Sequence, residues 1–462
     1  MIRYSLVMLK RFASEALAGS TTFVAMVVVM AVLPDVLCGQ ALGTTTGFSA
    51  DAVVWSTAIA VAIGCVLMGT IGRLPLAVGP TYGQAFFLVL TLIPAAAAAG
   101  SVEPWRTALG ATLLAGVALL LLSLFGLRTF VLRAVDAQLQ TAIGCGIGLL
   151  IAAMGLRAAG IIAPGAGAFR LVLDLRSPDV IVCVIGIVVA GMLQARGWRT
   201  ALLIATVVAF VSAWLLRSYV PTVLPQWAAT DAWTASQIQS AAVPTHPIGL
   251  PARRFDGFFS LDIAGAVAPQ MWMPTLLLLF SMLSDSTTGL LALMHHGGFI
   301  SSNDDPPVRR AMIADSLSTV ASSLLGVSAC GAYAESNAGI ASGGRGGLTA
   351  VTAGVLMLAA LLCAPIVEAL GNYPPASAPV LVLVGAAMAS QLRRLQWNDP
   401  AASVPMLLVI VGIPLTSSIA DSMAAALLAS PVLKLAAGRA RDTSLLAWVF
   451  AAAMLGYFIW LR

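Results

Sequence analysis

Apolar stretches long enough to cross a lipid bilayer recur along almost the whole chain. A helix of about 20 residues spans the roughly 30 Å of hydrocarbon in a bilayer. We predict about fourteen such segments, at 17–33, 52–71, 76–96, 107–126, 137–156, 179–195, 200–217, 272–294, 311–327, 331–345, 349–370, 376–391, 401–433 and 443–461. Only 9% of the residues are charged and 60% are hydrophobic, which is far from the composition of a water-soluble domain. The sequence therefore predicts an all-α polytopic membrane protein in the lipid bilayer.

The basic residues predict its orientation. Most arginines and lysines between the spans, such as Arg73 and Arg309, fall on the side of the N-terminus. Because cytoplasmic loops are enriched in these residues, we expect a cytoplasmic N-terminus in the inner or plasma membrane. Lys434 and Arg439 lie on this side only if 401–433 is a bent hairpin. The net charge of +5 fits such loops and does not indicate a nucleic-acid partner.

Two interrupted spans lie at corresponding places in the two halves of the chain, which the loop 218–271 separates. Residues 76–84 contain Gly79, Pro80 and Gly83, and residues 326–337 contain Gly331. Paired interruptions of this kind indicate a transporter built from inverted repeats. With seven spans in each half, the second half would run upside down. The alternative is that glycine and proline only kink packed helices.

Glu335 is the most informative polar residue because it follows the second interruption inside an apolar region. We expect it at the start of a half-helix, beside Tyr333, Ser336 and Asn337. A carboxylate there can accept hydrogen bonds from the N–H groups of a flat ligand, and Tyr82 and Tyr333 can add an aromatic face. Alternatively, Glu335 only caps its own half-helix.

Asp285 is a second acid within a predicted span. Ser281 and Thr288 share its helical face, which must therefore turn toward the protein interior or a wet cavity. Since burial disfavours a charged carboxylate, Asp285 or Glu335 can hold a coupling proton. The alternative is a polar cluster that packs helices. Thr22 and Gln84 can line the same cavity or bond one helix to another.

Signatures of enzymes are missing from the sequence. There is no Walker A sequence for ATP, and no nucleophile and base stand in a recognisable pattern. The three histidines have no metal-ligand partner at a useful spacing. We therefore predict a transporter and not an enzyme, with no cofactor and no metal.

Several stretches resemble a known transporter family. Residues 333–350, YAESNAGIASGGRGGLTA, resemble the signature of the adenine/guanine/hypoxanthine permeases, a branch of the nucleobase–cation symporter-2 or nucleobase–ascorbate transporter family. Residues 18–23, 147–156, 284–289, 313–318 and 414–421 resemble further spans of that branch, in the same order.

The resemblance implies a seven-plus-seven inverted repeat with short strands and half-helices in spans 3 and 10. It implies a core domain at 1–134 and 272–371, a gate domain at 135–217 and 372–462, and an extracellular loop at 218–271. Asp285 and Glu335 then match the ligand-binding acids of the family. The resemblance also implies proton-coupled uptake by movement of core against gate in a homodimer.

The expected site binds substrate through Glu335, Asp285, Tyr333, Ser336, Asn337, Gln84, Tyr82 and Thr22, with Asp285 and Glu335 coupling the proton. Asn337 and Gln84 depart from the family pattern, in which a small residue and an asparagine are usual. We predict import of a purine nucleobase: hypoxanthine, guanine, adenine or xanthine. The alternatives are another flat, amide-like heterocycle, such as uracil, or an anion carrier on the same fold.

Overall fold

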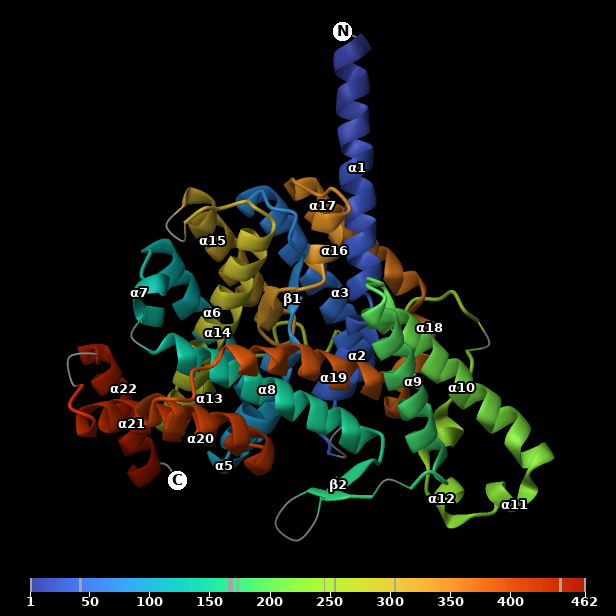
Figure 1. The fold of residues 1–462 in the computed structure, drawn as a ribbon. Helices are drawn as coiled ribbons and strands as arrows, with labels where there is room; N and C mark the ends of the chain where they lie inside the picture. Colours follow the sequence, from blue (N-terminus) through green and yellow to red (C-terminus); the bar gives the residue numbers. More distant parts are fainter. Residues whose placement is uncertain are drawn as a thin grey trace. The chain divides into compact units, whose positions relative to one another are not determined.

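The computed structural model describes residues 2–40, 44–133, 135–164, 169–172, 174–244, 246–252, 255–302, 305–439 and 443–460, and these are mostly helical (Figure 1). In these ranges nine helices are long and apolar enough to cross a membrane, and four shorter apolar helices accompany them. The prediction of an all-α polytopic membrane protein is confirmed. The count of long helices is below fourteen because several predicted spans are short or broken.

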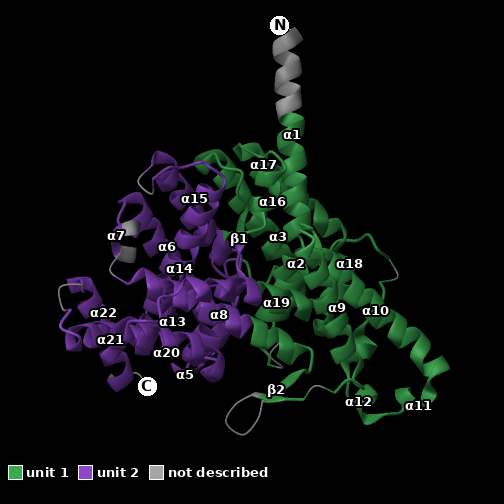
Figure 2. Cartoon of the chain, viewed as in Figure 1, with its two compact units in different colours: residues 1–79, 152–258, 332–384 green, residues 80–151, 259–331, 385–462 purple. Residues whose placement is uncertain are grey.

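The chain divides into two compact units, each assembled from three separate segments (Figure 2). Unit 1 comprises 1–79, 152–258 and 332–384, and unit 2 comprises 80–151, 259–331 and 385–462. The first half of the chain visits units 1, 2 and 1, and the second half visits units 2, 1 and 2. The two halves of the chain thus visit the two units in exchanged order. The units group residues by packing, and the division into core and gate stays a prediction.

Unit 1 holds the N-terminal helices and the second interrupted segment. Its elements are α1 (Ile2–Met26), α2 (Val29–Leu37), α3 (Ala50–Leu67), η2 (Met68–Gly72), β2 (Ile162–Pro164), β3 (Phe169–Leu171), α9 (Pro178–Ala195), α10 (Ala201–Val223), α11 (Pro225–Ala228), α12 (Asp231–Thr234), η4 (Gln237–Ser240), α16 (Ser336–Ala341), α17 (Gly347–Ala359), η5 (Ala360–Leu362) and α18 (Ala364–Gly371). Helix α17 packs on α1 and α3, and α9 packs on α10. The strands β2 and β3 pair antiparallel.

Glu15 joins α1 to the start of α17. Its buried carboxylate accepts hydrogen bonds from the backbone N–H groups of Arg345 and Gly346, at 3.1 Å each, and from the Thr349 hydroxyl. The first N–H groups of a helix have no partner within the helix and favour an anion. Glu15 therefore supplies from a distant helix the acceptor that the N-terminus of α17 requires.

Unit 2 holds the first interrupted segment and the C-terminal helices. Its elements are α4 (Tyr82–Phe87), η3 (Leu88–Leu92), α5 (Ile93–Ala98), α6 (Pro104–Leu124), α7 (Arg128–Arg133), α13 (Ile263–Ala266), α14 (Pro269–His296), α15 (Pro306–Leu324), η6 (Ser390–Arg394), α20 (Pro400–Thr416), α21 (Ile419–Ala436) and α22 (Leu445–Trp460). Helix α6 packs on α14 and α15, and α21 packs on α20 and α22. The unit boundaries cross α8 (Ala137–Ala158), α19 (Pro374–Ala389), β1 (Val78–Pro80) and β4 (Cys330–Ala332).

Residues 401–433, predicted as one span or a bent hairpin, form the two helices α20 and α21, which meet at Ser417 in a left-handed conformation (φ 53°). Arg439, beyond the end of α21, pairs with Asp399 at the start of α20, with Nη1 and Oδ2 2.5 Å apart. This contact brings the two ends of the hairpin together. The hydrogen bond from Arg439 also holds the pKa of Asp399 below its usual value. The hairpin alternative is therefore the correct one.

The loop predicted at 218–271 is shorter than expected and partly helical. Helix α10 continues to Val223, and α14 begins at Pro269. Between them lie the short helices α11, α12, η4 and α13. Asp179 ties this region to α9, because its carboxylate accepts hydrogen bonds from the Gln237 N–H (2.8 Å) and the Tyr373 hydroxyl (2.7 Å).

Candidate functional site

Short strands replace helix in both interrupted segments, as predicted. Strand β1 precedes α4, β4 precedes α16, and the two strands form a two-stranded sheet. In unit 1, the carbonyl of Ala77 accepts from the Tyr333 N–H (2.9 Å), and the Ala77 N–H donates to the Ser336 hydroxyl (3.0 Å). In unit 2, the Thr81 N–H donates to the carbonyl of Ala329 (3.2 Å). The backbone groups that a broken helix leaves free are thus paired, as burial requires.

Gly79 allows this close packing in unit 1. A Cβ atom at Gly79 would lie 2.5 Å from a methyl group of Val61 and 2.9 Å from the ring and hydroxyl of Tyr333. A larger residue would therefore push the buried Tyr333 ring away from β1. The glycine that marks the interruption in the sequence is required by the contact with the tyrosine that follows β4.

In unit 2, Gln84 on α4 and Asp285 on α14 lie together. The Gln84 side chain is 2% exposed, and its Nε2 donates to Asp285 Oδ2 (3.5 Å) and to the Ser281 hydroxyl (3.4 Å). These bonds are long, and the Gln84 Oε1 atom is buried without a hydrogen-bond partner. The pair therefore offers acceptor oxygens that the fold does not use. Sequence analysis named both residues, and the structure brings these two together.

A cavity of about 380 Å³ opens beside Asp285. It lies within unit 2, between α8, α14, the end of α19 and η6, and its volume falls in the range of roughly 300–1,000 Å³ typical of small-molecule sites. Its lining comprises Gln140, Thr141, Ile143, Gly144, Ile147, Ser281, Ser284, Asp285, Thr288, Gly289, Ala292, Ala387, Met388, Ser390, Gln391, Arg393 and Arg394. The prediction that Ser281, Asp285 and Thr288 face a cavity is therefore confirmed.

Ser284 is a cavity residue that sequence analysis missed. Its side chain is 4% exposed, and its hydroxyl is buried without a hydrogen-bond partner. The signal was present in the sequence, because Ser284 lies three residues after Ser281 and four before Thr288. It belongs to the same stripe of small polar residues along α14.

Glu335 occupies the position before the first residue of α16, in unit 1. Its side chain is half-buried, and its carboxylate makes no capping hydrogen bond to the helix. Glu335 thus holds the N-cap position of α16 without a side-chain capping bond. Nearby on the chain, Tyr333 is buried, and the Oδ1 atom of Asn337 is buried without a hydrogen-bond partner.

Three further predicted site residues have identifiable positions. The hydroxyl of Ser336 holds β1 through the Ala77 N–H, as described above. Thr22 donates to the carbonyl of Ala18 one turn earlier (3.2 Å) and packs so closely against Gly339 that no side chain fits there. Tyr82 begins α4 and is half-buried. The structure therefore gives Ser336 and Thr22 a packing role inside unit 1.

Arg128 forms a buried polar cluster on the side of α14 away from Ser281. All the guanidinium nitrogens have partners: Thr287 (2.7 Å), Ser286 (2.9 Å), Asp315 (3.0 Å), the carbonyl of Met312 (3.3 Å) and Ser316 (3.4 Å). The side chains of Arg128 and Asp315 are 1% and 0% exposed. Arg309 and Arg310 lie nearer to Asp315 in the sequence, but the structure pairs Asp315 with Arg128.

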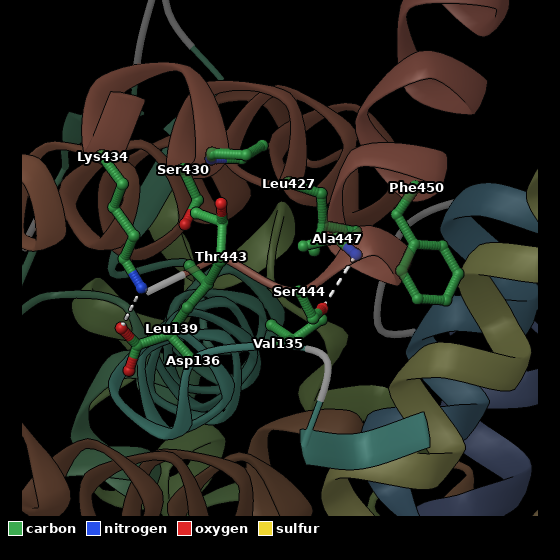
Figure 3. Close-up of a pocket in the computed structure, with 11 residues that line it drawn as sticks. Val135, Asp136, Leu139, Leu427, Ser430, Lys434, Thr443, Ser444, Ala447 and Phe450 are labelled. Atoms are coloured by element: carbon green, nitrogen blue, oxygen red, sulfur yellow. Dashed lines mark hydrogen bonds and ion pairs between the residues drawn. The ribbon is translucent and has the colours of Figure 1, made fainter. Parts of the chain in front are cut away.

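Asp421 accepts a hydrogen bond from the Tyr457 hydroxyl (3.0 Å) and so joins α21 to α22. A smaller cavity of about 250 Å³ lies between α8, α21 and α22 (Figure 3). Its one lysine, Lys434, is paired with Asp136 at 2.7 Å. Since Asp136 directly precedes α8, this ion pair places the end of α21 beside the start of α8.

Comparison with known proteins extends over nearly the whole chain. The sequence profile of the permease family matches residues 13–425. The adenine permease AdeP of Escherichia coli is 30% identical over 432 residues, which cover 93% of this chain and 89% of AdeP. The guanine/hypoxanthine permease PbuO of Bacillus subtilis is 31% identical over 442 residues, or 95% of each chain. This chain belongs to the purine permease branch of the nucleobase–ascorbate transporter family.

Solved structures show the fold of this purine permease family member. The transmembrane domain of a cyanobacterial bicarbonate transporter, BicA, matches with a TM-score of 0.63 at 17% identity, over 89% of this chain and 97% of that domain. The murine Slc26a9 anion transporter, in its inward-facing state, matches with a TM-score of 0.63 at 12% identity, over 92% of this chain and 68% of its own. At these identities the similarity concerns the fold alone.

Proposed function

We propose that this protein is a secondary transporter that imports purine nucleobases. The observation that carries the proposal is the Gln84–Asp285 pair beside a cavity of about 380 Å³, in a chain about 30% identical to adenine and guanine/hypoxanthine permeases. The absence of a Walker A sequence favours coupling to an ion gradient over coupling to ATP.

The acceptor oxygens of Asp285 and Gln84 suit the N–H groups on the edge of a purine. Asp285 offers its carboxylate, and Gln84 offers the Oε1 atom that no protein group uses. The Ser284 hydroxyl can donate to a ring nitrogen or a carbonyl of the base. A buried polar atom without a partner is costly, so a ligand that satisfies it gains affinity and selectivity.

The proposal also includes residues of unit 1. Glu335 stands in the family motif, and its carboxylate makes no capping hydrogen bond to α16. Tyr333, Asn337, Ser336 and Thr22 are proposed as its neighbours in the site, and Tyr82 as an aromatic contact from the first interrupted segment. Their roles rest on the resemblance of the motif.

Proton coupling through Asp285 or Glu335 completes the proposed mechanism. Protonation of a buried acid and binding of a base can depend on each other, so that the two cross together. Movement of a core against a gate domain, a homodimeric assembly and a cytoplasmic N-terminus in the inner or plasma membrane belong to the same proposal.

Uptake by proteoliposomes tests the proposal. Labelled hypoxanthine, guanine, adenine, xanthine and uracil would be supplied with and without an inward proton gradient. We expect saturable uptake of at least one purine, accelerated by the gradient. Purine uptake that ignores the gradient would remove proton symport, and uptake of uracil alone would favour the second substrate class.

Variants of the acids make the test specific. Glu335→Gln and Asp285→Asn should each abolish purine uptake without lowering the amount of folded protein. Asp421→Asn is the matched control, because Asp421 is also a membrane acid but bonds Tyr457. Wild-type uptake by Glu335→Gln and Asp285→Asn would refute the proposed site.

An anion carrier on the same fold is the competing function. The solved structures of that fold include a bicarbonate and an anion transporter, yet they share only 12–17% of their residues with this chain. The sequence relatives at about 30% are named as purine permeases. Electrogenic bicarbonate or chloride flux without purine uptake would reverse this preference.

A further inference from the structure

Arg128 is a fully buried arginine whose contacts converge on one turn of α14. Its Nε and Nη2 atoms donate to the hydroxyls of Thr287 and Ser286, which directly follow Asp285 in the chain. On the other side, Nη2 and Nη1 donate to Asp315 and to the carbonyl of Met312 on α15. The planar guanidinium therefore bridges α15 to the turn of α14 that carries Asp285.

The geometry requires an arginine. A guanidinium has five N–H donors in a rigid fork, and in this cluster each of the five has an acceptor. A lysine ammonium has three donors and cannot reach both faces of the cluster at once. The Ser286 hydroxyl also donates to Asp315, so the serine is held by both members of the ion pair.

The cluster also affects charge. Arg128 is the cation that pairs with Asp315, with Nη2 and Oδ2 3.0 Å apart and both side chains buried. A buried ion pair contributes little net stability, but removing one partner leaves a costly unpaired charge. Without Arg128, the α14 turn would lose its two hydrogen bonds to the guanidinium, and Asp315 would be left without its cation in the protein interior.

We propose that Arg128 is a positioning residue of the substrate site: it binds Ser286, Thr287 and Asp315 and thereby fixes the direction in which Asp285 faces Gln84 and the cavity. This inference rests on the proposed role of Asp285 in substrate binding. Arg128 itself does not line the cavity, so its effect on substrate must pass through the α14 turn.

Substrate affinity of the purified full-length protein tests the inference, with the best purine from the uptake panel as the labelled probe. Thr287→Val removes one hydrogen bond from Arg128, and Ser286→Ala removes one from Arg128 together with the bond from Ser286 to Asp315. Each should raise the Kd roughly 2- to 12-fold, the range that corresponds to one net hydrogen bond. Arg128→Lys removes the fork that bonds α14 and α15 at the same time, and it should raise the Kd more than tenfold, while the maximal uptake per folded molecule changes less.

Ser123→Ala is the matched control. Ser123 bonds Ser316 in the same buried cluster (2.9 Å), and its side-chain hydrogen bonds go to Ser316 and Leu119 and not to Arg128 or α14, so the Kd of Ser123→Ala should stay within twofold of the wild type. The inference would be overturned if Ser286→Ala and Thr287→Val left the Kd unchanged and reduced the amount of folded protein only as much as Ser123→Ala does.

A double variant separates positioning from charge balance. Arg128→Met with Asp315→Leu removes the ion pair as a whole and should restore the folded amount lost in Arg128→Met alone, because replacing both partners is tolerated better than breaking a pair. Its Kd should remain raised. Recovery of both the amount and the Kd would mean that Arg128 only neutralises Asp315. Asp285→Asn tests the proposed function separately. If this variant binds purines normally, Asp285 is not part of the substrate site, whatever the Arg128 variants show.

Discussion

Gly79→Ala is expected to disturb the site through a single added methyl group. In unit 1 that methyl would lie 2.5 Å from Val61 and 2.9 Å from the Tyr333 ring and hydroxyl, where ordinary contacts are nearly 4 Å. The neighbours are buried, and β1 is held by hydrogen bonds on its flanks. Overpacking of this kind costs about 1–3 kcal/mol.

Gly144→Ala is the matched control, since a Cβ atom at Gly144 meets no atom within 4 Å. Gly144 lies inside α8 and lines the cavity. In a helix, alanine is favoured over glycine by roughly 0.5–1 kcal/mol. The same substitution should therefore destabilise at Gly79 and be neutral or slightly stabilising at Gly144.

The assay is the melting temperature of the detergent-solubilised protein, followed by size-exclusion chromatography, together with the Kd for the labelled purine. Gly79→Ala should melt several degrees below the wild type, with weakened binding because Tyr333 is displaced. Gly144→Ala should melt at or above the wild-type temperature. Equal melting of the two variants would refute the close contact among Gly79, Val61 and Tyr333.

Three further predictions concern contacts within one unit. Glu15→Ala leaves two backbone N–H groups at the start of α17 without an acceptor and should cost about 3–6 kcal/mol, seen as a large loss of folded protein; the isosteric Glu15→Gln should lose less. Single cysteines that replace Asp399 or Arg439 should react with a membrane-impermeant thiol reagent from the same side of the membrane, because Arg439 Nη1 and Asp399 Oδ2 are 2.5 Å apart. Labelling from opposite sides would refute the α20–α21 hairpin. Gln84→Leu removes the donor to Asp285 and an unused acceptor, and it should raise the purine Kd at least tenfold at unchanged abundance, whereas an unchanged Kd would exclude Gln84 from the site.

Sequence periodicity predicted the cavity-facing side of α14 correctly. Ser281, Asp285 and Thr288 are spaced by one helical turn, and in a lipid bilayer such a polar face must turn toward the protein interior or a cavity. The paired interruptions at Gly79 and Gly331 were equally visible, because glycine and proline punctuate apolar spans. Features that depend on one local period or one backbone break could therefore be read from the sequence.

The Arg128–Asp315 pair could not be read in this way. Its members are 187 residues apart, and nothing local distinguishes Arg128 from the basic residues that mark cytoplasmic loop ends. Arg309 and Arg310 are closer to Asp315 in the sequence, so proximity along the chain points to the wrong partner. Only the packing of α7 against α14 shows that the arginine points into the protein. The hairpin at 401–433 was similarly ambiguous, since its turn at Ser417 has neither glycine nor proline.

The contact between Glu15 and the start of α17 has a consequence for biosynthesis. Its partner Thr349 emerges from the ribosome 334 residues later, which at about 5–20 residues per second takes roughly 15–70 s. During that time the Glu15 carboxylate on α1 lacks the three donors that it bonds in the final structure, which come from residues 345–349. Neither unit has all its segments until residue 384 is made. Unit 1 is therefore completed only after residues 332–384 are made, and unit 2 only after residues 385–462, well past the midpoint of synthesis.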